Sequence, residues 1–234
     1  MSENFDFLLR TVLKGLPYTA GAAAGGIALA AVLSFAAGLA LLSRSRGVRL
    51  VSRVYVEGFR GTSEVVQLFW IYFALPVLVG LQLVPLFAGI LVLGLNHGAY
   101  GAEIVRGAVQ SVPRAQVEGA VALGFGPVRR MRRVILPQAV AEMLPPFTNL
   151  FIQLLKNTSL LFLIQVPEIF HQGELLRPRF GNELGTIYAI LAVLYLVLAL
   201  LITFVMGRLE RIAARRLGRK AAGRDGALAA GKGV

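Results

Sequence analysis

Five long apolar runs, separated by polar and charged segments, organise this sequence. They cover residues 16–42, 53–76, 85–107, 145–166 and 186–206. The first run contains no charged residue, and the last contains only apolar and hydroxyl-bearing residues. A transmembrane helix needs about 20 mostly apolar residues, so each run is long enough to cross a membrane. The pattern predicts an all-α, polytopic membrane protein with five transmembrane helices.

The composition supports this prediction and excludes several kinds of chemistry. The chain is 56% hydrophobic and 15% charged, whereas soluble domains are about 45–50% apolar and about 25% charged. It contains no cysteine, which excludes disulfides, thiolate metal sites and cysteine nucleophiles. Its two histidines, His97 and His171, lie far apart in the sequence, so no metal centre is expected.

The basic residues, which give a net charge of +12, are concentrated in three polar segments: 43–53, 106–144 and the chain after residue 206. In the segments 1–15 and 167–185, acidic residues equal or outnumber the basic ones. The positive-inside rule places the three basic segments in the cytoplasm. The N-terminus is therefore expected outside and the C-terminus inside, which agrees with an odd number of spans.

This topology divides the chain into three parts. Residues 1–15 are expected to form a periplasmic N-terminal segment, residues 16–216 the transmembrane domain, and residues 217–234 a basic, disordered cytoplasmic tail. Residues 226–233 of the tail resemble a phosphate-binding P-loop, but no hydroxyl residue follows Lys232 and no strand precedes the loop. The chain itself is therefore expected to bind neither ATP nor another cofactor.

The cytoplasmic loop between the third and fourth runs, residues 108–144, has the features of a docking segment. Ser111 and Pro113 suit the start of a helix, and small residues follow from Glu118 to Ala122. A helix face of small residues lets the backbone of another protein approach closely.

A tight turn is expected to end that helix. Gly124 and Gly126 allow positive φ, and Pro127 suits the start of the next segment. The arginines between residues 129 and 133 then predict a short helix that stops at Pro137.

Four ordered motifs in the sequence resemble segments of known transport proteins. They are Glu118-Gly119-Ala120 with Gly124 and Val134-Ile135-Leu136-Pro137; Phe59-Arg60-Gly61-Thr62 with Val66-Gln67-Leu68; Ala99-Tyr100-Gly101-Ala102-Glu103-Ile104-Val105-Arg106-Gly107; and Leu155-Lys156-Asn157-Thr158-Ser159-Leu160. The first resembles the EAA loop of ABC importer permeases, with Gly119 in place of Ala and Val134 in place of Ile. The other three resemble the polar amino-acid (His/Glu/Gln-type) branch of these permeases, with Ser63-Glu64 in place of its usual Pro-Leu.

The resemblance implies a fold, partners and a coupling site. The fold would be the five-helix, MetI-like type I permease in a bacterial inner membrane. The partners would be an ABC ATPase dimer that binds ATP and Mg²⁺, a second permease subunit in a homo- or heterodimer, and a periplasmic or lipid-anchored binding protein; no nucleic acid is expected. The implied ATPase-coupling residues are Glu118, Gly119, Ala120, Gly124, Phe125, Gly126, Pro127, Leu136 and Pro137.

Two stripes of polar residues run along the predicted spans. Asn96, Tyr100 and Glu103 share one face of the third span, and Asn149, Gln153 and Asn157 share one face of the fourth. Polar groups inside a membrane rarely face lipid. The stripes therefore either line a substrate pathway or join helices through hydrogen bonds. In either case Glu103 and Lys156 are candidates for an intramembrane ion pair, and His97 is expected to be a packing residue.

These observations predict a permease subunit that carries a polar amino acid or a related small zwitterion, such as an ectoine-type compatible solute. No nucleophile motif such as Gly-x-Ser-x-Gly is present, so the chain is not expected to be an enzyme. The alternative is a proton-coupled secondary transporter in which Glu103, Lys156 or His97 titrates. Such a transporter should show an internal repeat with interrupted helices, and the sequence shows none.

Overall fold

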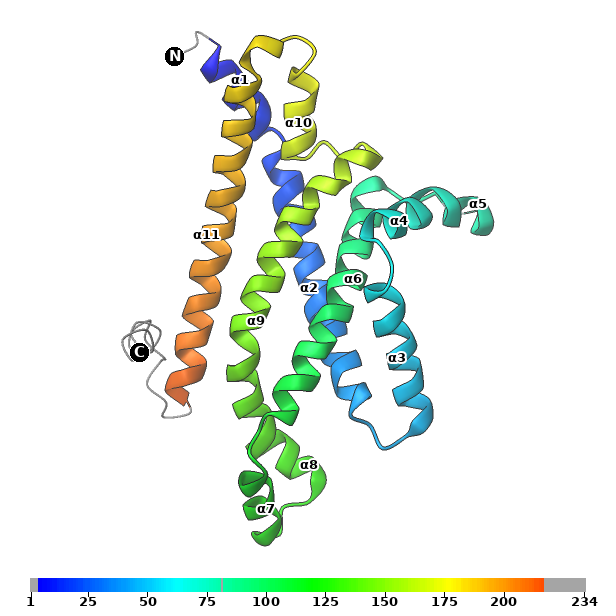
Figure 1. The fold of residues 1–234 in the computed structure, drawn as a ribbon, viewed down its shortest axis with the longest axis vertical. Coiled ribbons are helices and arrows are strands. Elements are labelled where there is room, and N and C mark those ends of the chain that lie inside the picture. Colours follow the sequence, from blue (N-terminus) through cyan, green and yellow to red (C-terminus); the bar gives the residue numbers. More distant parts are fainter. Residues whose placement is uncertain (1–3, 81, 217–234) are drawn as a thin grey trace, which may run out of the picture.

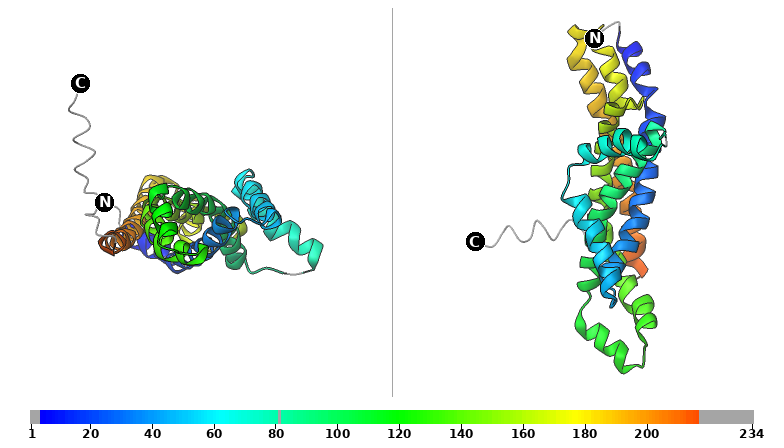
Figure 2. Two further views of the ribbon diagram at one scale, coloured as in Figure 1. Left: turned by 90° about the horizontal axis from the view of Figure 1, so that it is seen from below. Right: turned by 90° about the vertical axis from the view of Figure 1, so that its right-hand side faces the viewer.

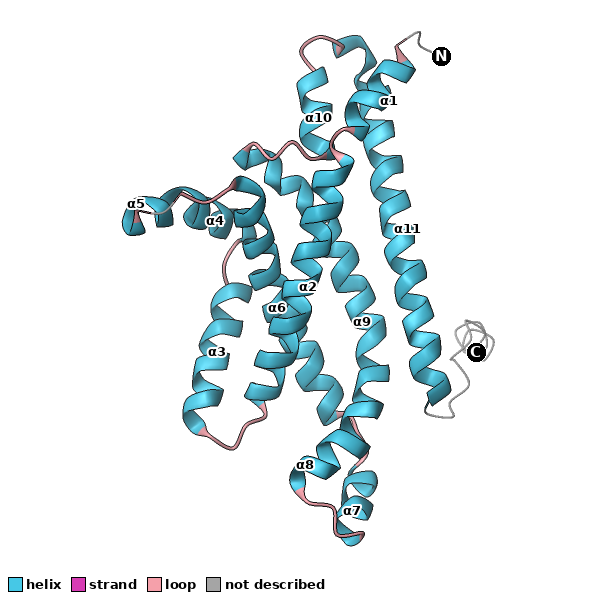
Figure 3. Ribbon diagram, turned by 180° about the vertical axis from the view of Figure 1, so that it is seen from behind, coloured by secondary structure: helices cyan, strands magenta, loops and turns pink. Residues whose placement is uncertain are grey.

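The computed structural model describes residues 4–80 and 82–216 and forms an elongated helical bundle (Figure 1). The P-loop-like segment of the tail lies outside the described residues. Figure 3 shows helices and loops but no strand in the part described, so the predicted all-α class is confirmed. Four long helices build the body of the bundle: α2 (Leu16–Leu41), α6 (Pro85–Gln110), α9 (Leu136–Asn157) and α11 (Leu184–Arg216).

Shorter helices close the two ends of the bundle. At one end, α1 (Phe5–Leu13) packs against α10 (Ile169–Leu176) and α11, and the 3₁₀ turns η3 (Thr158–Ile164) and η4 (Gly181–Glu183) flank α10. At the other end lie α7 (Arg114–Ala122) and α8 (Pro127–Arg130), which is followed by the π-helical turn η2 (Met131–Ile135).

A side arm projects from the bundle, and its far end lies away from the bundle (Figure 2). We call residues 46–79 the arm. It consists of α3 (Arg46–Arg60), α4 (Glu64–Phe69), the π-helical turn η1 (Trp70–Ala74) and α5 (Leu75–Val79). Its outer part projects sideways at the height of α6's first turns (Figure 1).

Three stretches of the described chain are long and apolar enough to cross a membrane: Phe5–Leu41, Pro127–Ile164 and Gly181–Arg215. The arm adds a fourth if its two halves are counted as one broken span. The chain is thus a multi-pass helical membrane protein, although length and composition do not confirm the count of five. The helix α6 falls below this test, because polar residues such as Asn96, Glu103 and Arg106 interrupt it.

The second predicted span, 53–76, was wrong as a single helix. Its first part belongs to α3, which begins earlier, at Arg46, and the chain then bends by 104° between Arg60 and Glu64. Ser63 adopts an extended conformation, with φ −68° and ψ 131°, that cannot continue a helix. The apolar run therefore contains a sharp bend, the corner of the arm, that its composition does not reveal.

The expected stop at Pro137 was also wrong, because one continuous helical stretch of 38 residues runs from Pro127 to Ile164. The helix passes the proline immediately after the π-helical turn η2. A proline cannot donate to the carbonyl four residues earlier, and the wider turn already interrupts that hydrogen-bond pattern. Pro76 follows the turn η1 in the same way.

The fourth run was likewise expected to begin at residue 145, but α9 begins at Leu136 and contains Pro145 and Pro146 in its interior. Ala139 and Met143, which precede these prolines, are buried in a cluster with Val105 of α6 and Met206 of α11. Burial of these side chains stabilises the helix upstream of the apolar run.

Small residues on α6 let α2 pack closely against it. A Cβ on Gly94 would lie 2.5 Å from the Leu29 side chain, and one on Gly98 would lie 2.8 Å from Leu33. A side chain at either position would therefore force the two helices apart.

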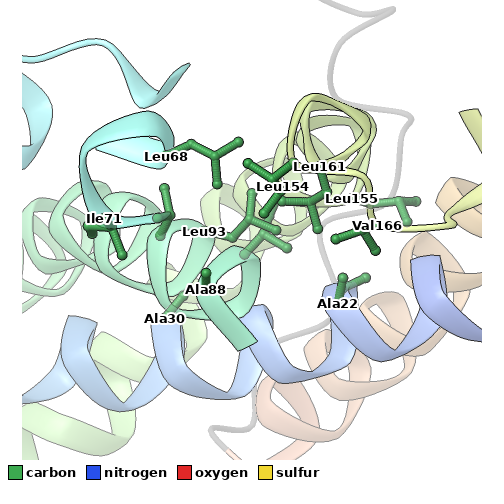
Figure 4. Close-up of a cluster of buried hydrophobic side chains, with 13 residues drawn as sticks. Ala22, Ala30, Leu68, Ile71, Ala88, Leu93, Leu154, Leu155, Leu161 and Val166 are labelled. Carbon is green, nitrogen blue, oxygen red and sulfur yellow. The ribbon is translucent and has the colours of Figure 1, made fainter. Parts of the chain in front are cut away.

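The main core joins the arm to the bundle (Figure 4). Leu68 and Ile71 of the arm are buried in the same cluster as Leu93 of α6 and Leu154 of α9. Leu161 of η3 completes the contact, and Figure 4 shows these side chains meeting between the helices. The arm is therefore held at its corner, and α3 also packs against the bundle through Val56, which is buried with Ala37 of α2 and Ala102 of α6.

Candidate transport pathway and coupling site

Two buried amide side chains hold the corner of the arm together. Gln67 donates hydrogen bonds to the carbonyl of Phe59 at 2.8 Å and to the hydroxyl of Thr62 at 2.7 Å. Asn96 of α6 donates to the same Phe59 carbonyl and to the Gln67 side-chain oxygen, both at 3.1 Å. The last carbonyls of a helix lack partners within the helix. The amides supply such partners, so Asn96 fixes where α3 ends.

Glu64, at the start of α4, meets side chains from two other helices. Its Oε2 accepts a hydrogen bond of 2.5 Å from Asn157 of α9, and its Oε1 lies 3.6 Å from Nδ1 of His97 on α6. His97 Nδ1 also lies 3.1 Å from the carbonyl of Leu93. Glu64 Oε1 is buried and makes no hydrogen bond to the described part of the chain. The sequence singled out Glu64 only as a departure from a motif; an acid inside an apolar run was the available signal.

Nearly two turns further along α6, an ion-pair cluster joins this helix to α3. Glu103 accepts from Arg106 Nη2 at 2.6 Å and Nε at 2.8 Å, and it lies 3.9 Å from Arg60 Nη1. The Arg60 guanidinium lies 5.2 Å from the centre of the Tyr100 ring. Of the candidate partners of Glu103, the structure places Arg106 and Arg60 at the carboxylate rather than Lys156. Arg106 lies one turn away on the same helix face, within reach of Glu103.

The two predicted polar stripes therefore differ in how many of their residues contact the arm. Asn96, Tyr100 and Glu103 all reach α3 or the corner of the arm. Of the α9 stripe, Asn157 contacts the arm, whereas Asn149 and Gln153 are exposed on the surface of this protomer. The structure thus brings together four of the six stripe residues.

The docking loop folds into a helix and a turn that project beyond the bundle (Figure 1). Gly124 has φ +75°, which confirms that this glycine is needed for the turn. The N–H of Phe125 donates to the Ala120 carbonyl and the N–H of Gly124 to the Val121 carbonyl, both at 2.9 Å, as in a Schellman motif. Gly126 is extended, with φ −64°, so of the two glycines only Gly124 uses the positive φ that glycine allows.

The surface around this turn is open and apolar. A hollow of about 420 Å³ is lined by residues of α7, the turn and η2, namely Ala115, Gln116, Gly119, Ala120, Leu123, Phe125 and Val134. A Cβ on Gly119 would meet no heavy atom within 4 Å, and Leu123 is 76% exposed. Glu118, Pro127 and Pro137 are exposed as well, and Leu136 is half-buried.

The expected start of the loop helix was displaced. Ser111 ends α6, with its hydroxyl donating to the Ala108 carbonyl at 2.9 Å, and Pro113 precedes the first helical residue, Arg114. Ser111 and Pro113 therefore mark the connection between α6 and α7.

The structure combines a bundle of membrane helices with an arm that is broken at a polar corner and a loop that projects from the bundle. Together these features define a membrane transport subunit. A family model described as "Binding-protein-dependent transport system inner membrane component" matches residues 26–217. The chain belongs to this family. It is a multi-pass component of the inner membrane and a transport subunit rather than an enzyme, and the family implies ATPase and binding-protein partners.

Curated relatives cover most of the chain. A probable amino-acid ABC transporter permease protein of Sinorhizobium fredii is 45% identical over 195 residues, which are 81% of this chain and 82% of the relative. The glutamine transport system permease protein of Escherichia coli is 38% identical over 202 residues, which are 86% and 91% of the two chains.

Solved structures share the fold. The crystal structure of an amino acid ABC transporter with histidines matches with a TM-score of 0.80 and 28% identity, covering 90% of this chain and 99% of that one. An inward-facing structure of the MetNI methionine ABC transporter matches with a TM-score of 0.69 and 23% identity, covering 91% and 99%. The predicted MetI-like fold is confirmed.

Proposed function

We propose that this chain is the membrane-spanning permease subunit of an ABC importer for a polar amino acid or a related small zwitterion. The observation that carries the proposal is the polar surface where the arm meets α6 and α9. There, amide donors, carboxylates and the Arg60 guanidinium lie along about two turns of α6, from Asn96 to Glu103. A zwitterion needs both donors and acceptors along its path, and this surface offers both.

The names of the relatives support this cargo class. Their names include glutamine, cystine and octopine transport systems. An ectoine-type compatible solute is a zwitterion of similar size and stays among the cargoes to be tested. The comparisons do not support the alternative of a proton-coupled secondary transporter.

We propose five spans, made by α2, the arm, α6, α9 and α11, with the N-terminus outside and the C-terminus in the cytoplasm. The arm and α6 are the two spans that length and composition alone do not give. The distribution of basic residues supports this orientation, because the docking loop and the end of α11 are both rich in arginine.

We also propose that the turn Gly124–Pro127, with the small-residue face of α7, is seated on an ABC ATPase that binds ATP and Mg²⁺. The hollow beside Gly119 supports this contact, since a neighbouring side chain can enter it. The proposed substrate path is lined by Asn96, Tyr100, Glu103 and Asn157, with Asn149 and Gln153 facing a second permease subunit. A binding protein would deliver the cargo from outside.

Uptake by the complete complex tests the proposal. The permease, its ATPase and its binding protein are reconstituted in liposomes and supplied with labelled L-glutamine, L-histidine, L-arginine or ectoine, with maltose as the control cargo. We expect ATP-dependent uptake of at least one zwitterion and none of maltose. Uptake confined to maltose, or no zwitterion uptake by a complex whose ATPase is active, would contradict the cargo class.

A further inference from the structure

The charged residues of α3 lie on one face of that helix. Arg46, Arg49, Arg53, Glu57 and Arg60 recur every three or four residues, and all five are exposed. Ser52 and Val56, on the side facing the bundle, are buried. We call the five exposed residues the charged stripe. Charged side chains in a membrane segment face a water-filled cavity or a protein partner rather than lipid. The stripe is therefore expected to face water or a protein partner.

The stripe ends at Arg60, where α3 meets α6. Arg60 and Arg106 both face the single carboxylate of Glu103, so this cluster carries one surplus positive charge. Arg106 satisfies Glu103 with two close contacts, at 2.6 and 2.8 Å. Arg60 is therefore the arginine whose positive charge Glu103 does not balance.

The Arg60 guanidinium is held in place but has free donors. Its Nη1 is 3.9 Å from Glu103, too far for a hydrogen bond, and within the described residues its side chain donates none. It lies 5.2 Å from the Tyr100 ring centre, so the ring positions it without using its N–H groups. Its side chain is 41% exposed. A guanidinium carries five donors in a planar fork, which matches the two oxygens of a carboxylate.

We propose that Arg60 binds the carboxylate of the cargo at the corner of the arm and so acts as a specificity-determining residue. The inference rests on the proposed function, because it requires a cargo that carries a carboxylate. The stripe adds to the attraction: together with Arg106 and Glu103 it holds five arginines against two glutamates, and this excess attracts anionic groups toward Arg60. The carbonyl of Phe59, the residue before Arg60, accepts hydrogen bonds from the amides of Asn96 and Gln67, so these polar groups lie next to the proposed carboxylate site.

A purely structural role for Arg60 predicts different behaviour. As the last residue of α3, its charge also suits the negative end of the helix. In that role the Arg60→Gln variant would lower the thermal stability of the complex without changing the preference for a free carboxylate.

The first experiment measures uptake by the reconstituted complex with saturating binding protein. We expect Arg60→Gln to reduce the maximal rate of amino-acid uptake about tenfold or more, since it removes a charge-assisted contact. Arg60→Lys, which keeps the charge but loses the fork, should recover part of that rate. The matched control is Arg211→Gln, an exposed arginine of α11, which should change the rate less than about twofold. Equal rates in Arg60→Gln and the control would overturn the inference.

The second experiment measures binding to the purified permease–ATPase complex without binding protein. The probes are L-glutamine and L-histidine, each compared with its α-carboxamide. We expect the wild-type complex to bind at least one amino acid about tenfold more tightly than its amide, and Arg60→Gln to lose that preference. A preserved preference in Arg60→Gln, or none in the wild type, would overturn the inference. If Arg60→Gln does not assemble, the wild-type comparison and Arg60→Lys carry the test. Absence of zwitterion uptake by the wild type instead contradicts the proposed function.

Discussion

At the residue scale, Glu168 shows how a buried carboxylate is used for structure. It is 0% exposed and caps α10, accepting hydrogen bonds from the N–H groups of Phe170 at 2.7 Å and His171 at 2.6 Å. The hydroxyl of Tyr195 donates a third, at 3.0 Å. Burial raises the pKa of Glu168 to about 7, because it outweighs these three contacts, which act in the opposite direction.

This shift predicts a pH dependence of stability. Below about pH 4.5 Glu168 is protonated in both the folded and the unfolded chain, so its ionisation costs nothing. Between about pH 4.5 and 7 only the unfolded chain loses the proton, so stability falls as the pH rises, by at most about 3 kcal/mol. We expect thermal unfolding to show this fall for the wild type relative to Glu168→Gln. A difference between the two proteins that is constant from pH 4.5 to 8 would contradict the assignment.

Gly124 makes a second prediction at this scale. Its φ of +75° is strained for any β-branched residue, whereas Gly126, two residues on, has φ −64°, and a Cβ at either position would meet open space. We expect Gly124→Val to lower stimulation of the ATPase by binding protein several-fold at normal membrane insertion, and Gly126→Val to lower it much less. Equal losses in the two variants would show that bulk, rather than turn geometry, matters at this surface.

At the scale of elements, the hydrogen bond between Glu64 and Asn157 links the arm to α9. A double-mutant cycle with Glu64→Ala and Asn157→Ala should give a coupling free energy of about 1–3 kcal/mol in thermal unfolding. Asn149, two turns earlier on α9 and exposed, supplies the control. Its Ala variant should show no coupling to Glu64, and a coupling near zero for Asn157 would remove the link from the account.

The sequence predicted those elements whose limits depend on apolar runs alone. The first and third runs gave α2 and α6 nearly to the residue, and the fifth predicted most of α11. The corner of the arm escaped prediction because Asn96, 37 positions away, supplies a partner for the Phe59 carbonyl. Pro137 misled for a related reason: whether a proline ends a helix depends on the turn before it.

The site was predicted in part for similar reasons. Helical spacing was enough to place Asn96, Tyr100 and Glu103 on one face, because that face depends only on the period of α6. Pairing across helices was not accessible in this way. The sequence could offer Lys156 to Glu103, and the helical spacing alone places Arg106 within reach of Glu103. Only the packing of α3 against α6 shows that Arg60 also lies there.

At the scale of the whole molecule, we expect this chain to be inert alone. Accumulation against a gradient requires an energy source, and the chain carries no complete nucleotide-binding motif. Liposomes that contain only the purified chain should accumulate no labelled L-glutamine or L-histidine, with or without ATP. Addition of the ATPase and the binding protein to the same preparation is the positive control. Accumulation by the chain alone would contradict its role as one subunit of an importer.

The absence of cysteine from the whole sequence makes its orientation directly measurable. Asn182, in η4 between α10 and α11, and Leu123, at the end of α7, are both exposed. Figure 1 shows α10 and α7 at opposite ends of the bundle. In intact spheroplasts, a membrane-impermeant maleimide should label Asn182→Cys and spare Leu123→Cys. Leu123→Cys should react only after the membrane is opened, and the reverse pattern would invert the proposed topology.

The π-helical turn at Met131–Ile135 sets the rotation of the helix that follows it about its axis, as well as the course of the chain. A turn closed by i→i+5 bonds holds one residue more than an α-helical turn, so everything beyond it is rotated by about 100°. The turn therefore sets the phase between the docking surface and the face of α9 that carries Asn157. A chain shortened by one residue there would keep almost the same composition and apolar pattern, yet would aim the two surfaces in different directions. In this helix, the number of residues between the docking surface and the Asn157 face therefore matters for function.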